Sequence, residues 1–367
     1  MPISAVDTIS LAFQHTKRQL IQPFRFWQWT RLAFVGLLAG EMGSGGGVNF
    51  PTSIPNIPQQ GGSSRHFAQG FSHIDPAILG AVITVLVISA FVFVIVMMYI
   101  SSIMRFVLFD SIIAKECRIR ASWSRRQGIG WKYLLWQLGI MLAMLTVMVV
   151  LVGIPAAIGL AAGWFKSPRE HMPVLILGGI FLFFLLMALF IAVAVVHVMT
   201  KDFVIPQMAI EGIGAIEGWR RLWAMLKGEK GGYAAYVGMK IVLAIGAGIV
   251  IGIATIIVFF VIALPSFAAG LVAVIAGKSA GLDWNVFAIT MAIVAGCVLF
   301  AVFFYLVALI SVPAIVFFPA YSIYFFAPRY RPLSVLLYPP PPSAAPNPPN
   351  TSPPKEPPPL PPTPQLA

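Results

Sequence analysis

The sequence predicts an all-α protein, a polytopic membrane helical bundle of about six transmembrane helices with short amphipathic helices at the membrane surface. Of its 367 residues, 59% are hydrophobic and 10% are charged, whereas a soluble domain carries about 25% charged residues. Asp, Glu, Lys and Arg are absent from residues 76–104, 133–165, 171–200, 241–277 and 284–328. Each stretch exceeds the ~20 residues that cross a hydrocarbon core of about 30 Å.

Five spans follow from these stretches, at about 77–104, 133–164, 173–199, 238–264 and 285–312. A sixth span is harder to place, because Arg31 and Glu41 enclose a short apolar run. When it is extended to about 27–47, with Trp27 and Trp29 at one interface, this segment is long enough to cross.

The basic residues decide whether this early segment crosses. With six spans and a cytoplasmic N-terminus, the positive-inside rule is obeyed by all of the 24 Lys and Arg residues except Arg65, Lys166, Arg169 and Lys278. Without the 27–47 span, more than half of the basic residues would face outward. We therefore predict a multi-pass protein of the cell (inner) membrane with both termini in the cytoplasm. The net charge of +12 is then explained by basic residues on the cytoplasmic side of the membrane. We therefore expect no nucleic-acid partner.

Composition divides the chain into three parts. Residues 1–24 form an N-terminal amphipathic segment and residues 25–337 the six-helix transmembrane domain. Residues 338–367 contain fifteen prolines and are predicted to be a disordered tail. The tail holds a Lys355-x-x-Pro358-x-x-Pro361 pattern of the kind that polyproline-binding grooves recognise, so it is either a docking segment for a protein partner or a spacer.

Two loops on the cytoplasmic side share a pattern that suggests an internal duplication. An aromatic order recurs in them, as Phe106, Trp123 and Tyr133 and then as Phe203, Trp219 and Tyr233. In the second loop, Ile216–Leu226 places apolar residues on one stripe, which predicts an amphipathic helix. The candidate contacts for anionic lipid headgroups are Arg125, Arg126, Arg220 and Arg221. Such contacts contribute about 1 kcal/mol each, and the alternative is that these arginines only set topology.

Small residues at four-residue spacing are the candidate helix-packing positions, because missing side chains let two membrane helices approach closely. They are Gly36 and Gly40, Gly159 and Gly163, and Gly248 and Gly252. Pro155, Pro265 and Pro313 are expected to kink or end their helices.

Motifs of known enzyme chemistry do not occur in the sequence, so we expect no catalytic, cofactor-binding or metal-binding residues. The remaining enzymatic alternative is a membrane-surface acid site built from inner-face carboxylates, namely Asp110, Glu116, Asp202, Glu211 and Glu217. Within the five clear spans the ionisable residue is His197, one turn from the inner interface. Intramembrane carboxylates that could drive a coupled transporter are not evident.

Three segments carry a resemblance to a known group: Pro23–Ala33, Asp202–Gly228 and Ser311–Pro328. They resemble the opening, a loop and the final helix of uncharacterised multi-pass bacterial membrane proteins. Those proteins are distantly similar to the membrane domain of some glycerophosphoryl diester phosphodiesterases. The phosphodiesterase catalytic domain has no counterpart in this sequence. The resemblance therefore implies a six-helix bacterial membrane domain and carries over no activity.

Two functions are compatible with these features. The first is a non-catalytic membrane module that organises lipids or partner proteins, as lipid-like spans and a basic inner face suggest. The second is an uncoupled transporter or channel for an apolar or amphipathic molecule, which glycine and proline within the spans would suit. A polar cavity lined by Thr146, Thr255, Thr290 and Ser311 would favour the second function, and a dry, closed bundle would favour the first.

Overall fold

The computed structural model describes residues 4–22, 24–41, 76–164, 169, 171–279 and 286–338. Every regular element within these residues is a helix, which confirms the predicted all-α class. Five helical stretches are long and apolar enough to cross a membrane: Ile78–Ala114, Ile119–Ala161, Met172–Glu211, Lys230–Ser279 and Ala288–Arg329. The proline-rich tail and the loop that holds His66 and His73 lie outside the described residues.

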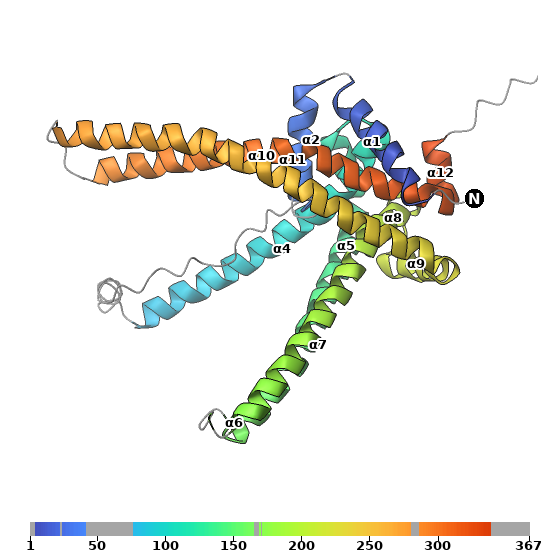
Figure 1. The fold of residues 1–367 in the computed structure, drawn as a ribbon, viewed down its shortest axis with the longest axis horizontal. Helices are drawn as coiled ribbons and strands as arrows, with labels where there is room; N and C mark the ends of the chain where they lie inside the picture. The colour runs from blue at the N-terminus through green and yellow to red at the C-terminus, as the bar shows by residue number, and fades with distance from the viewer. Residues whose placement is uncertain are drawn as a thin grey trace, which may run out of the picture.

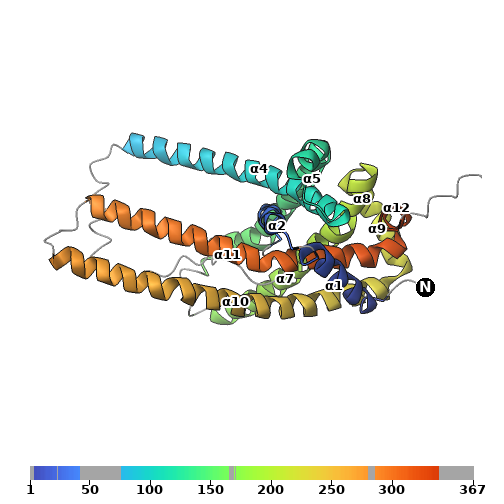
Figure 2. The ribbon, with the colours of Figure 1, turned by 90° about the horizontal axis from the view of Figure 1, so that it is seen from above.

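Three apolar arms radiate from one compact end of the molecule (Figures 1 and 2). The first arm is the outer part of α4 (Pro76–Ala114). In the second arm the chain runs out along α5 (Ile119–Met148), the π-helical turn η1 (Val149–Gly153) and α6 (Ile154–Ala161), and it returns along α7 (Met172–Met199). The third arm pairs α10 (Lys230–Ser279) with α11 (Val286–Phe326).

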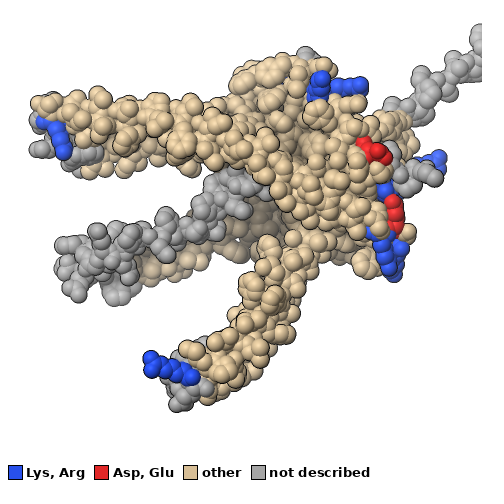
Figure 3. Space-filling model, in the orientation of Figure 1, with Lys and Arg blue, Asp and Glu red and all other residues tan. Residues whose placement is uncertain are grey.

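The compact end, which we call the hub, contains the remaining elements and the inner ends of the long helices. The remaining elements are α1 (Asp7–Leu20), α2 (Phe26–Leu38), the π-helical turn η2 (Thr200–Val204), α8 (Ile205–Glu211), α9 (Ala215–Gly228), η3 (Ala327–Arg329) and α12 (Arg331–Leu337). Charged side chains gather on the hub and at the arm tips, whereas the described surface visible along the length of the arms carries none (Figure 3).

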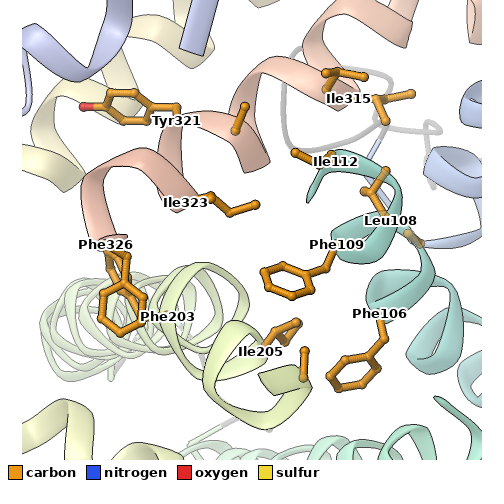
Figure 4. Close-up of a cluster of buried hydrophobic side chains, with 14 of the residues drawn as sticks. Phe106, Leu108, Phe109, Ile112, Phe203, Ile205, Ile315, Tyr321, Ile323 and Phe326 are labelled. Carbon is orange, nitrogen blue, oxygen red and sulfur yellow. The ribbon is translucent and has the colours of Figure 1, made fainter. Parts of the chain in front are cut away.

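Aromatic side chains fill the centre of the hub. Phe203 packs against Tyr236, Phe326, Tyr233 and Phe325 with ring centroids 5.0 to 6.0 Å apart. Around them lie aliphatic residues of α4, α8 and α11, which close the space between these helices (Figure 4). In the arms, by contrast, few residues are buried. In the most apolar 18-residue segment of each of the five stretches, the share of buried residues is 0%, 0%, 0%, 6% and 11%. The protein core is therefore confined to the hub.

The first helix packs on α11 with its polar face. His15 is hydrogen-bonded to the Tyr324 hydroxyl at 3.0 Å, and Gln19 donates to the Ser111 carbonyl oxygen at 3.0 Å. The apolar residues of α1 are divided: Leu20 is buried, whereas Val6 and Phe13 are exposed. The exposed side of α1 also carries the basic residues Lys17 and Arg18, a mixture that suits the membrane surface.

Helix α2 is short because a glycine terminates it. Gly40 adopts a φ of +75°, the left-handed region that glycine tolerates best. The Glu41 amide donates to the Gly36 carbonyl at 2.8 Å and the Gly40 amide to the Leu37 carbonyl at 3.1 Å, which is a Schellman motif. At 1.5 Å per residue, 13 residues extend about 20 Å. The part of the predicted 27–47 span that the structure describes is thus too short to cross alone.

Prolines coincide with the two π-helical turns. Pro155 follows η1 and Pro206 follows η2, each in the first turn of the next helix. Proline lacks an amide hydrogen and its ring clashes with the carbonyl four residues earlier, so a wider turn relieves the clash. By contrast, α10 continues through Pro265 and α11 continues through Pro313.

Candidate functional site at the junction of the arms

The π-helical turn η2 brings two opposite charges into the middle of the hub. Lys201 and Asp202 are adjacent in the sequence, and their side chains are 10% and 3% exposed. Nearly all of the chain from Thr200 to Ala209 is buried, so this stretch has protein on every side. π-Helical turns are rare and occur frequently at functional sites.

Lys201 forms an ion pair with Glu41, whose side chain is 3% exposed. Glu41 directly follows the Schellman motif that ends α2, so the glycine turn places the carboxylate inside the hub. The contact joins α2 to the end of α7.

Asp202 joins the same segment to α10. It accepts a hydrogen bond from the Tyr236 hydroxyl at 2.9 Å and forms an ion pair with Lys240. Tyr236 and Lys240 are one helical turn apart, so both face Asp202. Lys240 is 9% exposed, and its ammonium lies 5.9 Å from the Tyr236 ring centroid.

Arg105 brings α4 into the cluster. Its Nε donates to the Ala39 carbonyl oxygen at 3.0 Å, and its Nη1 donates to the Tyr133 hydroxyl of α5 at 2.8 Å. A cation at a helix C-terminus also interacts favourably with the helix dipole. Five charged side chains thus meet where α4, η2, α10 and the end of α2 come together. We call them the charge cluster: Glu41, Arg105, Lys201, Asp202 and Lys240.

A cavity of about 30 Å³ adjoins the charge cluster and is lined by Glu41, Arg105, Lys201 and Asp202 together with apolar residues. This volume holds about one water molecule. Both carboxylates of the cluster are in ion pairs, and Arg105 donates its hydrogen bonds to the Ala39 carbonyl oxygen and the Tyr133 hydroxyl. These contacts join helices, and the cavity beside them is too small for an organic substrate. Removing one partner of a buried ion pair destabilises a protein by about 3–5 kcal/mol. Because the charge cluster draws its residues from helices of all three arms, we expect it to hold the inner ends of these arms together.

The predicted arginine contacts have unequal environments. Arg126 pairs with Asp110 at 2.6 Å and donates to the Ala209 carbonyl oxygen at 2.5 Å, so it braces α5 against α4 and α8. Arg125 is exposed beside it. On α9, Arg221 pairs with Glu211 and Glu217, whereas Arg220 pairs with Glu217 and is 78% exposed. Hydrogen bonds from Arg221 hold the pKa of Glu217 below its usual range. Arg125 and Arg220 are therefore the more accessible members of the set.

The inner-face carboxylates are distributed over separate contacts. Asp110 faces Arg126, Glu116 pairs with Arg118 at 3.0 Å, and Glu211 accepts from the Tyr330 hydroxyl as well as from Arg221. Asp202 belongs to the charge cluster. His197 is exposed on α7 and lies close enough to the charge cluster to interact electrostatically with Arg105, Lys201, Glu41 and Asp202.

The candidate glycines also separate into different roles. A Cβ at Gly36 would lie 2.5 Å from Ile315 Cγ2, so this glycine lets α2 and α11 approach closely. Gly40 and Gly163 instead end helices, and each has a positive φ. The amide of the next residue, Glu41 or Trp164, donates to the carbonyl oxygen of Gly36 or Gly159, the first glycine of the same pair. Gly248 lies half-buried on α10, and a Cβ at Gly252 would meet nothing within 4 Å.

The matching aromatic residues of the two loops adopt one geometry. Phe106 meets Tyr133 edge to face at 5.9 Å and 89°, and Phe203 meets Tyr233 at 5.2 Å and 84°. The internal duplication stays a prediction, and this shared geometry is the arrangement it would produce.

Sequence reasoning missed the charge cluster, although one signal was available. Arg105, Lys201 and Lys240 sit at the ends of apolar stretches, where topology explains a basic residue. Topology does not explain an acidic residue such as Asp202 at the end of an apolar stretch. Pro206, four residues later, is the sequence signal for the π-helical turn that contains it. Two close-approach glycines outside the four-residue pattern were also missed. A Cβ at Gly130 would lie 2.5 Å from Ile103, and one at Gly218 would lie 2.7 Å from Val204.

Long apolar helices, exposed arms and a closed, charge-paired hub define a multi-span helical membrane protein. The chain belongs to the family described as a family of unknown function, DUF7544, whose model matches residues 3–336. This match gives no link to glycerophosphoryl diester phosphodiesterases. No curated protein and no solved structure matches the chain.

Proposed function

We propose that this protein is a non-catalytic module that organises lipids between its arms in the cell (inner) membrane. One observation carries the proposal. Residues 81–94 of α4 are exposed on every face of the helix, within a stretch that is long and apolar enough to cross a membrane. Apolar surface of this extent needs an apolar cover, and a lipid bilayer supplies acyl chains in the space beside α4.

The hub supports a structural role rather than a catalytic one. Its charge cluster contains two ion pairs, Lys201 with Glu41 and Lys240 with Asp202, and the adjoining cavity of about 30 Å³ has room for one water molecule. A rigid hub that holds three arms apart would set the width of the spaces that lipids enter.

The transporter alternative has less support in the geometry. The hydroxyl residues that would line a polar path are distributed over three helices, Thr146 on α5, Thr255 on α10, and Thr290 and Ser311 on α11. Thr146 and Ser311 each donate to a carbonyl oxygen of their own helix, at 2.9 Å. These positions do not define a polar path through the described helices.

We propose that the hub faces the cytoplasm. The basic residues counted as cytoplasmic gather there, as the positive-inside rule requires, and Figure 3 shows blue side chains on this end. The first and last described residues also lie at the hub, where the Tyr321 hydroxyl donates to the Ala5 carbonyl oxygen at 3.1 Å. The tail, residues 338–367, would then extend from the same face toward a protein partner.

The proposal is tested by native mass spectrometry of the full chain released from a mild detergent, combined with dye efflux from proteoliposomes. We expect several phospholipids to remain bound and dye efflux to equal that of protein-free vesicles. An Arg125→Ala/Arg220→Ala variant should retain a smaller share of anionic lipid, since both side chains are accessible. Arg126 and Arg221 are left intact because their side chains are less exposed, 13% and 38%, and because each connects two helices through its partners. Spectra without lipid would contradict the proposal, and rapid efflux would favour transport.

A further inference from the structure

A groove of about 570 Å³ opens between α7, α9 and α10, where the hub meets two of the arms. Its walls are mostly apolar and include Val195 of α7, Trp223 of α9 and Val237 of α10. Two lysines, Lys227 at the end of α9 and Lys230 at the start of α10, complete the lining. The groove is therefore basic at the hub end and apolar toward the arms.

Neither lysine is neutralised within the described chain. Glu229 lies between them in the sequence, but its carboxylate turns to Arg329, which donates to it at 2.6 and 2.9 Å. These hydrogen bonds hold the pKa of Glu229 below its usual range. Among the described carboxylates, none lies within ion-pair distance of Lys227 or Lys230. Two ammonium groups thus flank the groove without an internal counter-charge.

The apolar part of the groove points to a lipid rather than to a small anion. Val195 is close to the inner end of the α7 arm and Val237 is close to the inner end of the α10 arm, so the wall continues into both arms. Trp223 is exposed at the same level, and tryptophan is enriched at membrane interfaces. A free phosphate would use the lysines and leave this apolar wall uncovered.

A second groove gives an internal comparison. It has a volume of about 580 Å³, lies between α5 and α9, and is lined by Leu135, Ile140 and Ile216 with a single lysine, Lys132. Lys132 donates to the Gly212 carbonyl oxygen at 3.1 Å. Similar in size and apolarity, this groove lacks the two uncommitted ammonium groups.

We propose that the groove between α7, α9 and α10 binds one anionic phospholipid, with its phosphate between Lys227 and Lys230 and its acyl chains along Val195 and Val237. The inference rests on the proposed lipid-organising function and specifies its lipid class and position. The bound lipid fills the inner end of the space between the second and third arms.

The test titrates the full chain in detergent with phosphatidylglycerol or with phosphatidylcholine of the same acyl chains, and native mass spectrometry counts the first lipid bound. The wild-type protein should bind phosphatidylglycerol more tightly. The Lys227→Ala/Lys230→Ala variant should weaken that step about 30-fold, because each lysine contributes about 1 kcal/mol near a membrane surface and 1.4 kcal/mol is tenfold. The matched control, Lys17→Ala/Lys132→Ala, removes two exposed lysines and should leave the step unchanged.

A second variant, Val195→Trp, tests the acyl-chain wall while both lysines stay in place. It should also lose the tight phosphatidylglycerol, whereas excess inorganic phosphate should not displace the lipid from the wild-type protein. Full displacement by phosphate, equal binding of the two lipids, or an unchanged lysine double variant would each overturn the inference. If lipids remain bound without preference, the proposed function stands and this site fails; if neither lipid binds, the proposed function fails as well.

Discussion

At the residue scale, Asp202 is the side chain on which the hub depends most. It has two partners on α10, the Tyr236 hydroxyl and the Lys240 ammonium, and it follows Lys201, which pairs with Glu41. All of these groups are buried, where an unpaired charge is costly. The charge cluster therefore makes the hub sensitive to single substitutions and tolerant of paired ones.

Asp202→Asn should destabilise the protein by about 3–5 kcal/mol, because Lys240 is then buried without a counter-charge. Replacing both partners, in Asp202→Leu/Lys240→Met, should cost much less, because no buried charge is left unpaired. Thermal unfolding in detergent measures both effects. The control is Glu116→Gln, which breaks an exposed pair with Arg118 and should change stability by about 1 kcal/mol or less. Equal losses in the single and paired variants would contradict this account.

Individual side-chain roles could be predicted only in part. Arg126 and Arg221 were predicted as lipid contacts from their places in the two matching loops, and this stays a prediction. The sequence did not indicate their carboxylate partners, Asp110 for Arg126 and Glu211 for Arg221. Glu41 was placed within the predicted 27–47 span, and no local pattern indicates that it meets the distant Lys201. Pairings between residues about 160 positions apart depend on the tertiary fold, and no spacing rule reports them.

At the element scale, the long helices were predictable and their contacts were not. Apolar length alone identifies a span, and five such stretches are present. A helix in lipid is apolar on all faces, so no amphipathic stripe marks the side that packs on protein. Glycine spacing was ambiguous for a similar reason. Gly36-x-x-x-Gly40 fits close packing and also fits a Schellman motif, and here its first glycine packs while its second ends the helix.

Gly36→Ala and Gly130→Ala should each destabilise the hub by about 1–3 kcal/mol through overpacking. The new Cβ would lie 2.5 Å from Ile315 or Ile103, and both isoleucines are buried and stiff. The matched control is Gly252→Ala, where a Cβ meets nothing within 4 Å. Thermal unfolding in detergent measures all three variants. A loss for Gly252→Ala as large as for Gly36→Ala would show that the close approaches do not limit stability.

At the scale of the whole molecule, the side chains of the hub are packed together, whereas those of the arms are exposed. The hub joins helices through paired charges and an aromatic centre. Apolar surface is exposed on all sides of α4 over residues 81–94, and under the proposed function acyl chains cover it. Composition predicted a membrane protein, but a closed bundle and a set of separate arms have the same apolar sequence. The arrangement of arms was therefore beyond sequence reasoning.

The most direct measurement of lipid cover is a nitroxide scan of residues 81–94 of α4 in lipid vesicles, with oxygen as the relaxing agent. Because every one of these side chains is exposed, we predict high oxygen accessibility at all positions with no helical period. A closed bundle, or a partner helix against α4, would protect one face and give a period of about 3.6 residues. That period would contradict the account, because protein and not lipid would then cover the first arm.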